Sequence, residues 1–213
     1  MKNSTDEKFL PFSKPTNSEE AIAEVTDCLR SGWITTGPRT KRFETMLQEY
    51  LSATTHALCC SSATAGLFMA LKSLNLKPGD EVITSSMTFA ATLNCIVNAG
   101  GTPVLIDVEE DTYNIDLIHL KSALTDKTRA IIPVHFAGLP VDLDPLYKIA
   151  QQHGLRVIED AAHAIGTEYK GRRIGSFGDT QVFSFHPNKN MTTGEGGCIT
   201  TRNDSMAEAV NLL

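Results

Sequence analysis

Lys189 is the residue of this sequence best suited to covalent chemistry. It lies in the stretch VFSFHPNKNMTTGEGG (182–197), five residues after Ser184 and ahead of a glycine-rich turn. A lysine amine that is partly removed from water loses its proton more readily and can attack an aldehyde, which is how pyridoxal phosphate is carried as a Schiff base. A lysine in a polar turn is more often a solvated surface residue. The interpretation therefore depends on which other residues come to the same place.

Asp160 is the second candidate for chemistry. It follows the apolar run 157–159 and precedes the small residues and histidine of 161–164. A carboxylate at the end of a buried strand is costly unless it meets a cation. The protonated nitrogen of a pyridine ring would be such a cation, and a carboxylate there would keep the ring an electron sink. The sequence therefore predicts that Asp160 tunes a pyridine cofactor.

The small residues SSATAG (61–66), which we name the phosphate cup, form a third candidate site. They precede a helix that we expect over 67–74, where free N–H groups and the helix dipole favour an anion. Simple N-capping by Ser62 or Thr64 is the alternative interpretation. Phe89 follows the apolar run 81–84, and it could stack on an aromatic ring or belong to the core.

The composition indicates a soluble globular protein whose partners are small molecules. The chain has 213 residues, of which 41% are hydrophobic and 21% charged, and a formal net charge of -6. That charge gives no general attraction to nucleic acid or to an anionic membrane. The five cysteines include no CxxC pair, which fits neither a metal site nor a disulfide framework, so we expect reduced thiols and a cytoplasmic location.

Short apolar runs separated by helical stretches predict an α/β fold with a mostly parallel sheet covered by helices on both faces. The predicted strands are 57–60, 81–84, 103–107, 130–134, 157–159 and 197–200. Two amphipathic helices precede them, one starting within 17–20 with a capping residue and acids in its first turn and ending at 31–32, the other over 40–51. Ligands collect at the carboxyl ends of such strands, so we expect the candidate residues to meet there.

Six ordered motifs resemble those of one enzyme family. They are GWITTGP (32–38), SSATAG (61–66), GDEVIT (79–84), PVHFAG (133–138), VIEDAAHAIG (157–166) and SFHPNKNMTTGEGG (184–197). Together they resemble the DegT/DnrJ/EryC1/StrS family of pyridoxal-phosphate sugar aminotransferases, from about residue 10 to the last residue.

The resemblance implies the large domain of a fold-type-I aminotransferase, which forms a homodimer with active sites at the subunit boundary. Within the domain 1–213 it implies an N-terminal helical segment (1–52) and an α/β cofactor-binding part (53–213). Members of the family carry a further C-terminal domain. We therefore expect this chain to lack that small domain and to be an incomplete enzyme alone.

The resemblance also assigns roles to the residues around the cofactor ring. Lys189 would be the Schiff-base lysine and would shuttle a proton between substrate and cofactor. Asp160 would pair with the pyridinium nitrogen and Phe89 would stack on the ring. His163 would lie near the 3-hydroxyl of the ring.

Further residues are assigned by the resemblance to the phosphate and the substrate. Thr64 and Ala65 would bind the cofactor phosphate together with Ser184. Trp33 and His186 are weaker candidates for substrate contact.

The reaction implied by the resemblance moves an amino group from L-glutamate, which leaves as 2-oxoglutarate, to a nucleotide-linked keto-sugar. Such sugars serve cell-surface polysaccharide or lipopolysaccharide biosynthesis. SGWITTGP resembles enzymes that make UDP-4-amino-4-deoxy-L-arabinose, whereas PVHFAG and FSFHPNK resemble enzymes that aminate UDP-4-keto-6-deoxy-N-acetylhexosamines. Amination at C4 of a UDP sugar is common to both.

Three alternatives are compatible with parts of the sequence. A branch of the same family dehydrates keto-sugars, but it resembles this pattern with histidine where Lys189 stands. The chain could also be a catalytically incomplete fragment that binds cofactor weakly. The third alternative is that TTGEGG (192–197) is the nucleotide-binding loop of a dehydrogenase, but it lacks the GxGxxG pattern between a strand and a helix that such a loop requires.

Overall fold

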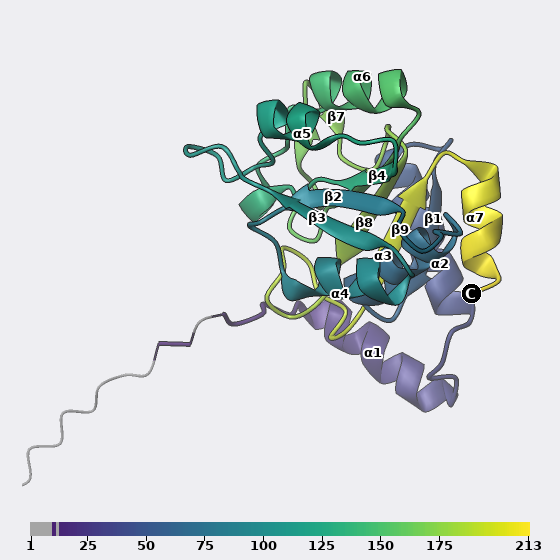
Figure 1. The fold of residues 1–213 in the computed structure, drawn as a ribbon. Coiled ribbons are helices and arrows are strands. Elements are labelled where there is room, and N and C mark those ends of the chain that lie inside the picture. The colour runs from purple at the N-terminus through teal and green to yellow at the C-terminus, as the bar shows by residue number, and fades with distance from the viewer. Residues whose placement is uncertain (1–9, 12) are drawn as a thin grey trace, which may run out of the picture. The chain divides into compact units, whose positions relative to one another are not determined.

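The computed structural model describes residues 10–11 and 13–213, which divide between Thr35 and Thr36 into two compact units. The first unit contains α1 (Glu19–Ser31) (Figure 1). Its start is set by Ser18, whose side chain accepts from the Ala21 N–H at 3.2 Å. Its end is set by Gly32, which adopts a left-handed φ of 74°. The predicted first helix is confirmed, and the structure identifies Ser18 as its cap. No helix among the described residues is both long and apolar enough to cross a bilayer.

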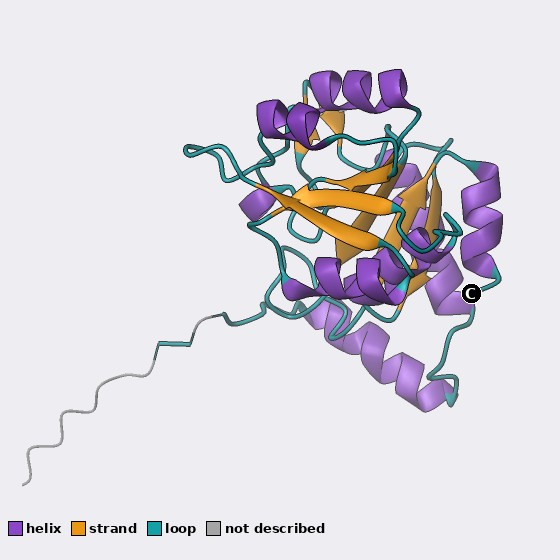
Figure 2. Cartoon of the chain, viewed as in Figure 1, coloured by secondary structure: helices purple, strands orange, loops and turns teal. Residues whose placement is uncertain are grey.

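The second unit is a sheet with helices on both of its faces (Figures 1 and 2). Its helices are α2 (Pro38–Leu51), α3 (Ala63–Lys72), α4 (Ala90–Asn98), α5 (Leu117–Ala123), the 3-10 turn η1 (Phe136–Gly138), α6 (Leu143–His153) and α7 (Asp204–Asn211). The strands of the main sheet are β1 (His56–Cys60), β2 (Glu81–Ser85), β3 (Thr102–Ile106), β4 (Thr128–Ile132), β5 (Arg156–Asp160), β8 (Thr180–Ser184) and β9 (Gly197–Thr201). A separate short hairpin consists of β6 (Glu168–Tyr169) and β7 (Arg172–Arg173).

The seven strands of the main sheet follow the order β1-β9-β8-β5-β4-β2-β3. Neighbours from β8 to β3 pair in parallel, whereas β9 is antiparallel to both β8 and β1. The mostly parallel sheet predicted from the sequence is therefore confirmed. Parallel strands end at the same edge, so the side chains that follow β5 and β8 are brought together.

Apolar cores lie on both faces of this sheet. On β5, Val157 packs into the core shared with α2, α5 and α6, and Ile158 into the core shared with α3, α4 and α7. Both side chains are 0% exposed. Burial on two faces explains why two adjacent residues of β5 are both apolar instead of alternating with polar ones.

Several element boundaries differ from the prediction by one to four residues, and two of these differences have a clear physical cause. α3 begins at Ala63 instead of 67, because the Ser62 side chain accepts from the Ala65 N–H at 3.1 Å and caps the helix there. The small residues therefore form the first turn of α3 rather than a loop before it. β4 ends at Ile132 instead of 134, since Pro133 has no N–H to continue the ladder. The α2 helix lies within the second unit, and the expected division of the domain at residue 52 stays a prediction.

Candidate active site

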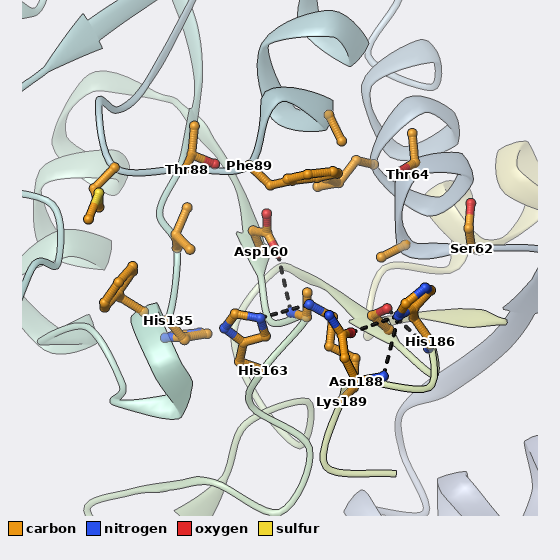
Figure 3. Close-up of a pocket in the computed structure, with 18 of the residues that line it drawn as sticks. Ser62, Thr64, Thr88, Phe89, His135, Asp160, His163, His186, Asn188 and Lys189 are labelled. Atoms are coloured by element: carbon orange, nitrogen blue, oxygen red, sulfur yellow. Dashed lines mark hydrogen bonds between the residues drawn. The ribbon is translucent and has the colours of Figure 1, made fainter. Parts of the chain in front are cut away.

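A cavity of about 520 Å³ lies at the carboxyl ends of β5 and β8 (Figure 3). Its lining includes these residues singled out from the sequence: Thr64, Phe89, Asp160, His163, Ser184, His186 and Lys189. They come from α3, from the segment before α4, from the last residues of β5 and β8, and from the segments that follow these two strands. The fold therefore brings residues 125 positions apart in the chain, from Thr64 to Lys189, onto one cavity surface.

The Lys189 amine meets the His163 imidazole inside the cavity. Lys189 Nζ lies 2.7 Å from His163 Nε2, and the Lys189 N–H donates to the His186 carbonyl at 2.9 Å, which holds the turn. Burial lowers the pKa of Lys189, although the charge of Asp160 opposes this shift. Burial and the neighbouring Lys189 also lower the pKa of His163. Both shifts favour an uncharged amine next to an uncharged imidazole, which is the state a nucleophilic lysine needs.

Asp160 ends β5 with a carboxylate that is buried but incompletely bonded. The residue is 6% exposed; its Oδ2 accepts from Thr92 Oγ1 and its Oδ1 from the Ala162 N–H, each at 3.2 Å. Burial raises the pKa of the Asp160 carboxyl, and these two hydrogen bonds oppose the shift. A carboxylate has about four lone-pair sites, so two bonds leave capacity for a further donor. A cationic N–H that enters the cavity would satisfy it.

Thr88 and Thr92 support Asp160, and the sequence did not reveal them. Thr88 Oγ1 lies 2.8 Å from Thr92 Oγ1. The Thr92 hydroxyl donates its only proton to Asp160, so in the contact between the two threonines Thr88 is the donor and Thr92 the acceptor. The hydrogen bonds therefore run from Thr88 through Thr92 to Asp160. Thr92 precedes Asp160 by 68 positions, so no local motif contains both residues.

Glu159 belongs to a different, structural network on the opposite face of β5. Its Oε2 lies 2.8 Å from His135 Nε2, and its Oε1 accepts from the Tyr147 hydroxyl and from Gln181 Nε2, both at 2.6 Å. The Val141 N–H donates to His135 Nδ1 at 3.1 Å, so the ring proton is on Nε2 and points at Glu159. Three donors therefore hold this buried carboxylate, which makes its position rigid.

Part of the phosphate cup lines the cavity. Thr64 and Ser184 line the cavity together with Ser62, whereas Ala65 does not. The Ala65 N–H is engaged by the Ser62 side chain at 3.1 Å, which is the N-capping alternative seen in the sequence. An anion at this helix start would meet Thr64 and Ser184 on the wall, and a role for Ala65 stays a prediction.

The other predicted residues lie as follows. Phe89 caps α4 and is 77% exposed, with its ring on the cavity wall above Asp160 in Figure 3. His186 also lines the cavity, and its Nδ1 lies 2.7 Å from the Asn188 side-chain oxygen. Trp33 belongs to the first compact unit, so its role toward a substrate stays a prediction.

Known proteins match nearly the whole chain. The DegT/DnrJ/EryC1/StrS aminotransferase family matches residues 15–213. The spore coat polysaccharide biosynthesis protein SpsC of Bacillus subtilis is 48% identical over 205 residues, which are 96% of this chain and 52% of that protein.

Two solved structures extend the comparison. Spr1654 from Streptococcus pneumoniae, a candidate sugar aminotransferase in its PLP form, is 40% identical with a TM-score of 0.90, over 96% of this chain and 57% of that chain. PseC from Helicobacter pylori, an aminotransferase involved in the biosynthesis of pseudoaminic acid, is 33% identical with a TM-score of 0.90, over 95% and 54%. The chain thus spans about half the length of the relatives it matches.

Proposed function

This chain belongs to the DegT/DnrJ/EryC1/StrS aminotransferase family, and from that membership we propose that the protein transfers an amino group to a keto-sugar with pyridoxal phosphate as cofactor. The observation that carries the proposal is the meeting of the Lys189 amine and the Asp160 carboxylate in one cavity, which the start of α3 also lines. The names of SpsC and PseC support a product used in a surface polysaccharide or a related sugar.

The residues present fit this cofactor. The cavity of about 520 Å³ lies within the usual range of ligand sites, roughly 300–1,000 Å³. Asp160 has acceptor capacity that a protonated ring nitrogen would fill, Lys189 would hold the cofactor covalently, and Thr64 and Ser184 would hold its phosphate. Bound there, pyridoxal phosphate would supply an electron sink for the transfer.

The chain's own residues would then hold and move protons. The lowered pKa of Lys189 favours the neutral amine, whose Nζ would accept a proton from the substrate Cα and return it as a positioned general base and acid. His163 Nε2, at 2.7 Å, orients that amine. Asp160 would face the ring nitrogen, and the donors Thr92 and Ala162 favour its charged form against the effect of burial.

The finer description is also a proposal. We infer L-glutamate as donor, C4 of a nucleotide-linked keto-sugar as acceptor, a homodimer and a cytoplasmic location. The presence of Lys189 disfavours the dehydratase branch of the family, which resembles this pattern with histidine at that position.

Covalent trapping tests the role of Lys189. The whole protein is loaded with pyridoxal phosphate and reduced with borohydride, and its peptides are mapped; the pyridoxyl label is expected on Lys189 and should be lost in Lys189→Ala. Lys170→Ala is the matched control, because Lys170 is an exposed lysine paired with Asp144. A label that stays after Lys189→Ala contradicts the assignment.

Glutamate-dependent turnover of a panel of nucleotide 4-keto-sugars tests the reaction. The expected product is the 4-amino sugar, with its position read by NMR. If Lys189 is labelled but every keto-sugar is refused, the cofactor assignment survives and the substrate class is wrong.

A further inference from the structure

Two cysteine side chains face each other across the β1–β9 strand pair. Cys59 lies directly opposite Cys198 in the antiparallel register. Both belong to the core on the α2, α5 and α6 side of the sheet, with Cys198 inside it and Cys59 packed against it. Cys60 points to the other side, where its Sγ donates to the Ser62 carbonyl at 3.2 Å and lies near Gly66. Of these two adjacent cysteines, Cys59 is therefore the one that faces Cys198.

The pair occupies a position in the ladder where no hydrogen bond joins the two residues. The Cys59 N–H points away from β9, because it donates to Glu44 Oε1 at 2.9 Å. On the other side of β9, the Gly196 carbonyl faces β8, where it accepts from the Phe185 N–H. Backbone groups alternate in direction along a strand, so those of Cys198, two residues later, also face β8 and not β1. In such pairs the Cα atoms are about 4.5 Å apart and the side chains approach closely. That separation lies inside the range a disulfide spans, roughly 4.4–6.8 Å.

The two thiols differ in access and in acidity. Cys59 is half-buried and lines a second cavity of about 320 Å³, whereas Cys198 is 0% exposed. A hydrogen bond between the two thiols lowers the pKa of Cys59, and the same contact together with burial raises the pKa of Cys198. The thiol that a reagent can reach is thus also the one that forms a thiolate more readily.

We propose that Cys59 and Cys198 form a thiol–disulfide exchange site that takes small, low-molecular-weight disulfides through the 320 Å³ cavity. The Cys59 thiolate attacks one sulfur of the small disulfide; that S–S bond breaks and one thiol leaves. Cys198 then gives up its proton and attacks Cys59 Sγ, which expels the second half of the reagent as a thiol. The two cysteines are oxidised to one disulfide, and the reagent is reduced to two thiols.

The site lies beside the phosphate cup. Cys59 is three residues before Ser62, and Cys198 directly follows Gly197, where a Cβ would lie only 2.5 Å from the Ser62 carbonyl carbon. The disulfide would therefore join the two strands on which the start of α3 rests.

Oxidised glutathione is the probe that tests this inference. The reduced protein is incubated with it in the absence of air, quenched in acid, and analysed by intact mass and by peptide mapping without reduction. We expect loss of the mass of two hydrogens, one cross-linked peptide that contains Cys59 and Cys198, and full reversal by dithiothreitol. Cys198→Ser is expected to stop at the first step, with one glutathione retained on Cys59.

Cys60→Ser is the matched control, because Cys60 is the neighbouring thiol on the opposite side of β1 and should leave the oxidation unchanged. The map of the unaltered protein decides the question even if Cys198→Ser does not fold, a point checked by circular dichroism. A disulfide that contains Cys60, a lasting glutathione adduct on Cys59 of the unaltered protein, or no reaction would each overturn the proposal.

Discussion

Replacing Asp160 by asparagine should stabilise the cofactor-free protein while removing its activity. The Asp160 carboxylate is 6% exposed and accepts only two hydrogen bonds, from Thr92 and from the Ala162 N–H. An asparagine carbonyl can accept from the Ala162 N–H, and its NH₂ group can donate to the Thr92 hydroxyl. The variant keeps both contacts and removes a buried charge that is only partly offset by the nearby Lys189 and His163.

The size of the effect follows from the unfilled acceptor capacity of the carboxylate. A buried polar group left without a partner costs about 1–3 kcal/mol, and we expect Asp160→Asn to recover about one such penalty. For a domain of this size, 1 kcal/mol moves Tm by roughly 2–4 °C, so the variant should melt about 2–12 °C higher.

The sign of the pH dependence can be stated as well. Burial raises the pKa of Asp160, so the folded protein binds this proton at a pH at which the unfolded chain has already lost it. The ionised residue therefore opposes folding above the raised pKa, and this opposition disappears as the pH falls through it. The advantage of Asp160→Asn should be largest at neutral pH and should shrink on acidification.

Thermal unfolding of the cofactor-free protein, followed by circular dichroism across a pH series, measures both effects. Thr92→Val is the control in the opposite direction, because it removes a donor from the same carboxylate and should lower Tm. With pyridoxal phosphate added, Asp160→Asn should gain less stability than the unaltered protein, since its ring partner is gone. An Asp160→Asn protein that melts at or below the original temperature would refute the reasoning.

Three further predictions follow from single contacts. Tyr147→Phe removes a donor to the buried Glu159 carboxylate and should cost about 1.5–3 kcal/mol in urea unfolding; an unchanged midpoint contradicts the network. Gly197→Ala would put a Cβ 2.5 Å from the Ser62 carbonyl carbon, backbone against backbone, so folded protein should be largely lost; a normal yield with unchanged circular dichroism argues against this packing. Because burial lowers the pKa of Lys189, an amine-acylating reagent should modify it before the exposed lysines at neutral pH, as peptide mapping can read; modification only at alkaline pH contradicts the shift.

Most of the fold could be predicted because strand positions depend on local pattern. Apolar runs such as 81–84 and 157–159 are buried on both faces, and each coincides with an observed strand. The start of α3 does not follow from the sequence, because both Ser62 and Thr64 are possible caps and only the side-chain hydrogen bond from the Ala65 N–H to Ser62 distinguishes them.

The candidate site was predictable only in its main groups. Asp160 and Lys189 stand in motifs whose residue types suggest their chemistry before any contact is known. Thr88 and Thr92 have no such signal, because threonines at the start of a helix are common and their value depends on Asp160, which lies far along the chain. The order of the strands in the sheet determines which distant residues meet, and this order cannot be read directly from the sequence.

Successive side chains of β5 point to opposite faces of the sheet, so the adjacent acids Glu159 and Asp160 have different roles. Glu159 turns toward His135, Tyr147 and Gln181, whose donors surround it, whereas Asp160 turns to the cavity with fewer donors than it can accept. Substitutions at these two adjacent positions should therefore have opposite effects: those at 159 should mainly impair folding, and those at 160 should mainly impair turnover. Neutral isosteres at 159 would be poorly tolerated by the fold, and at 160 they would be tolerated by the fold but not by catalysis.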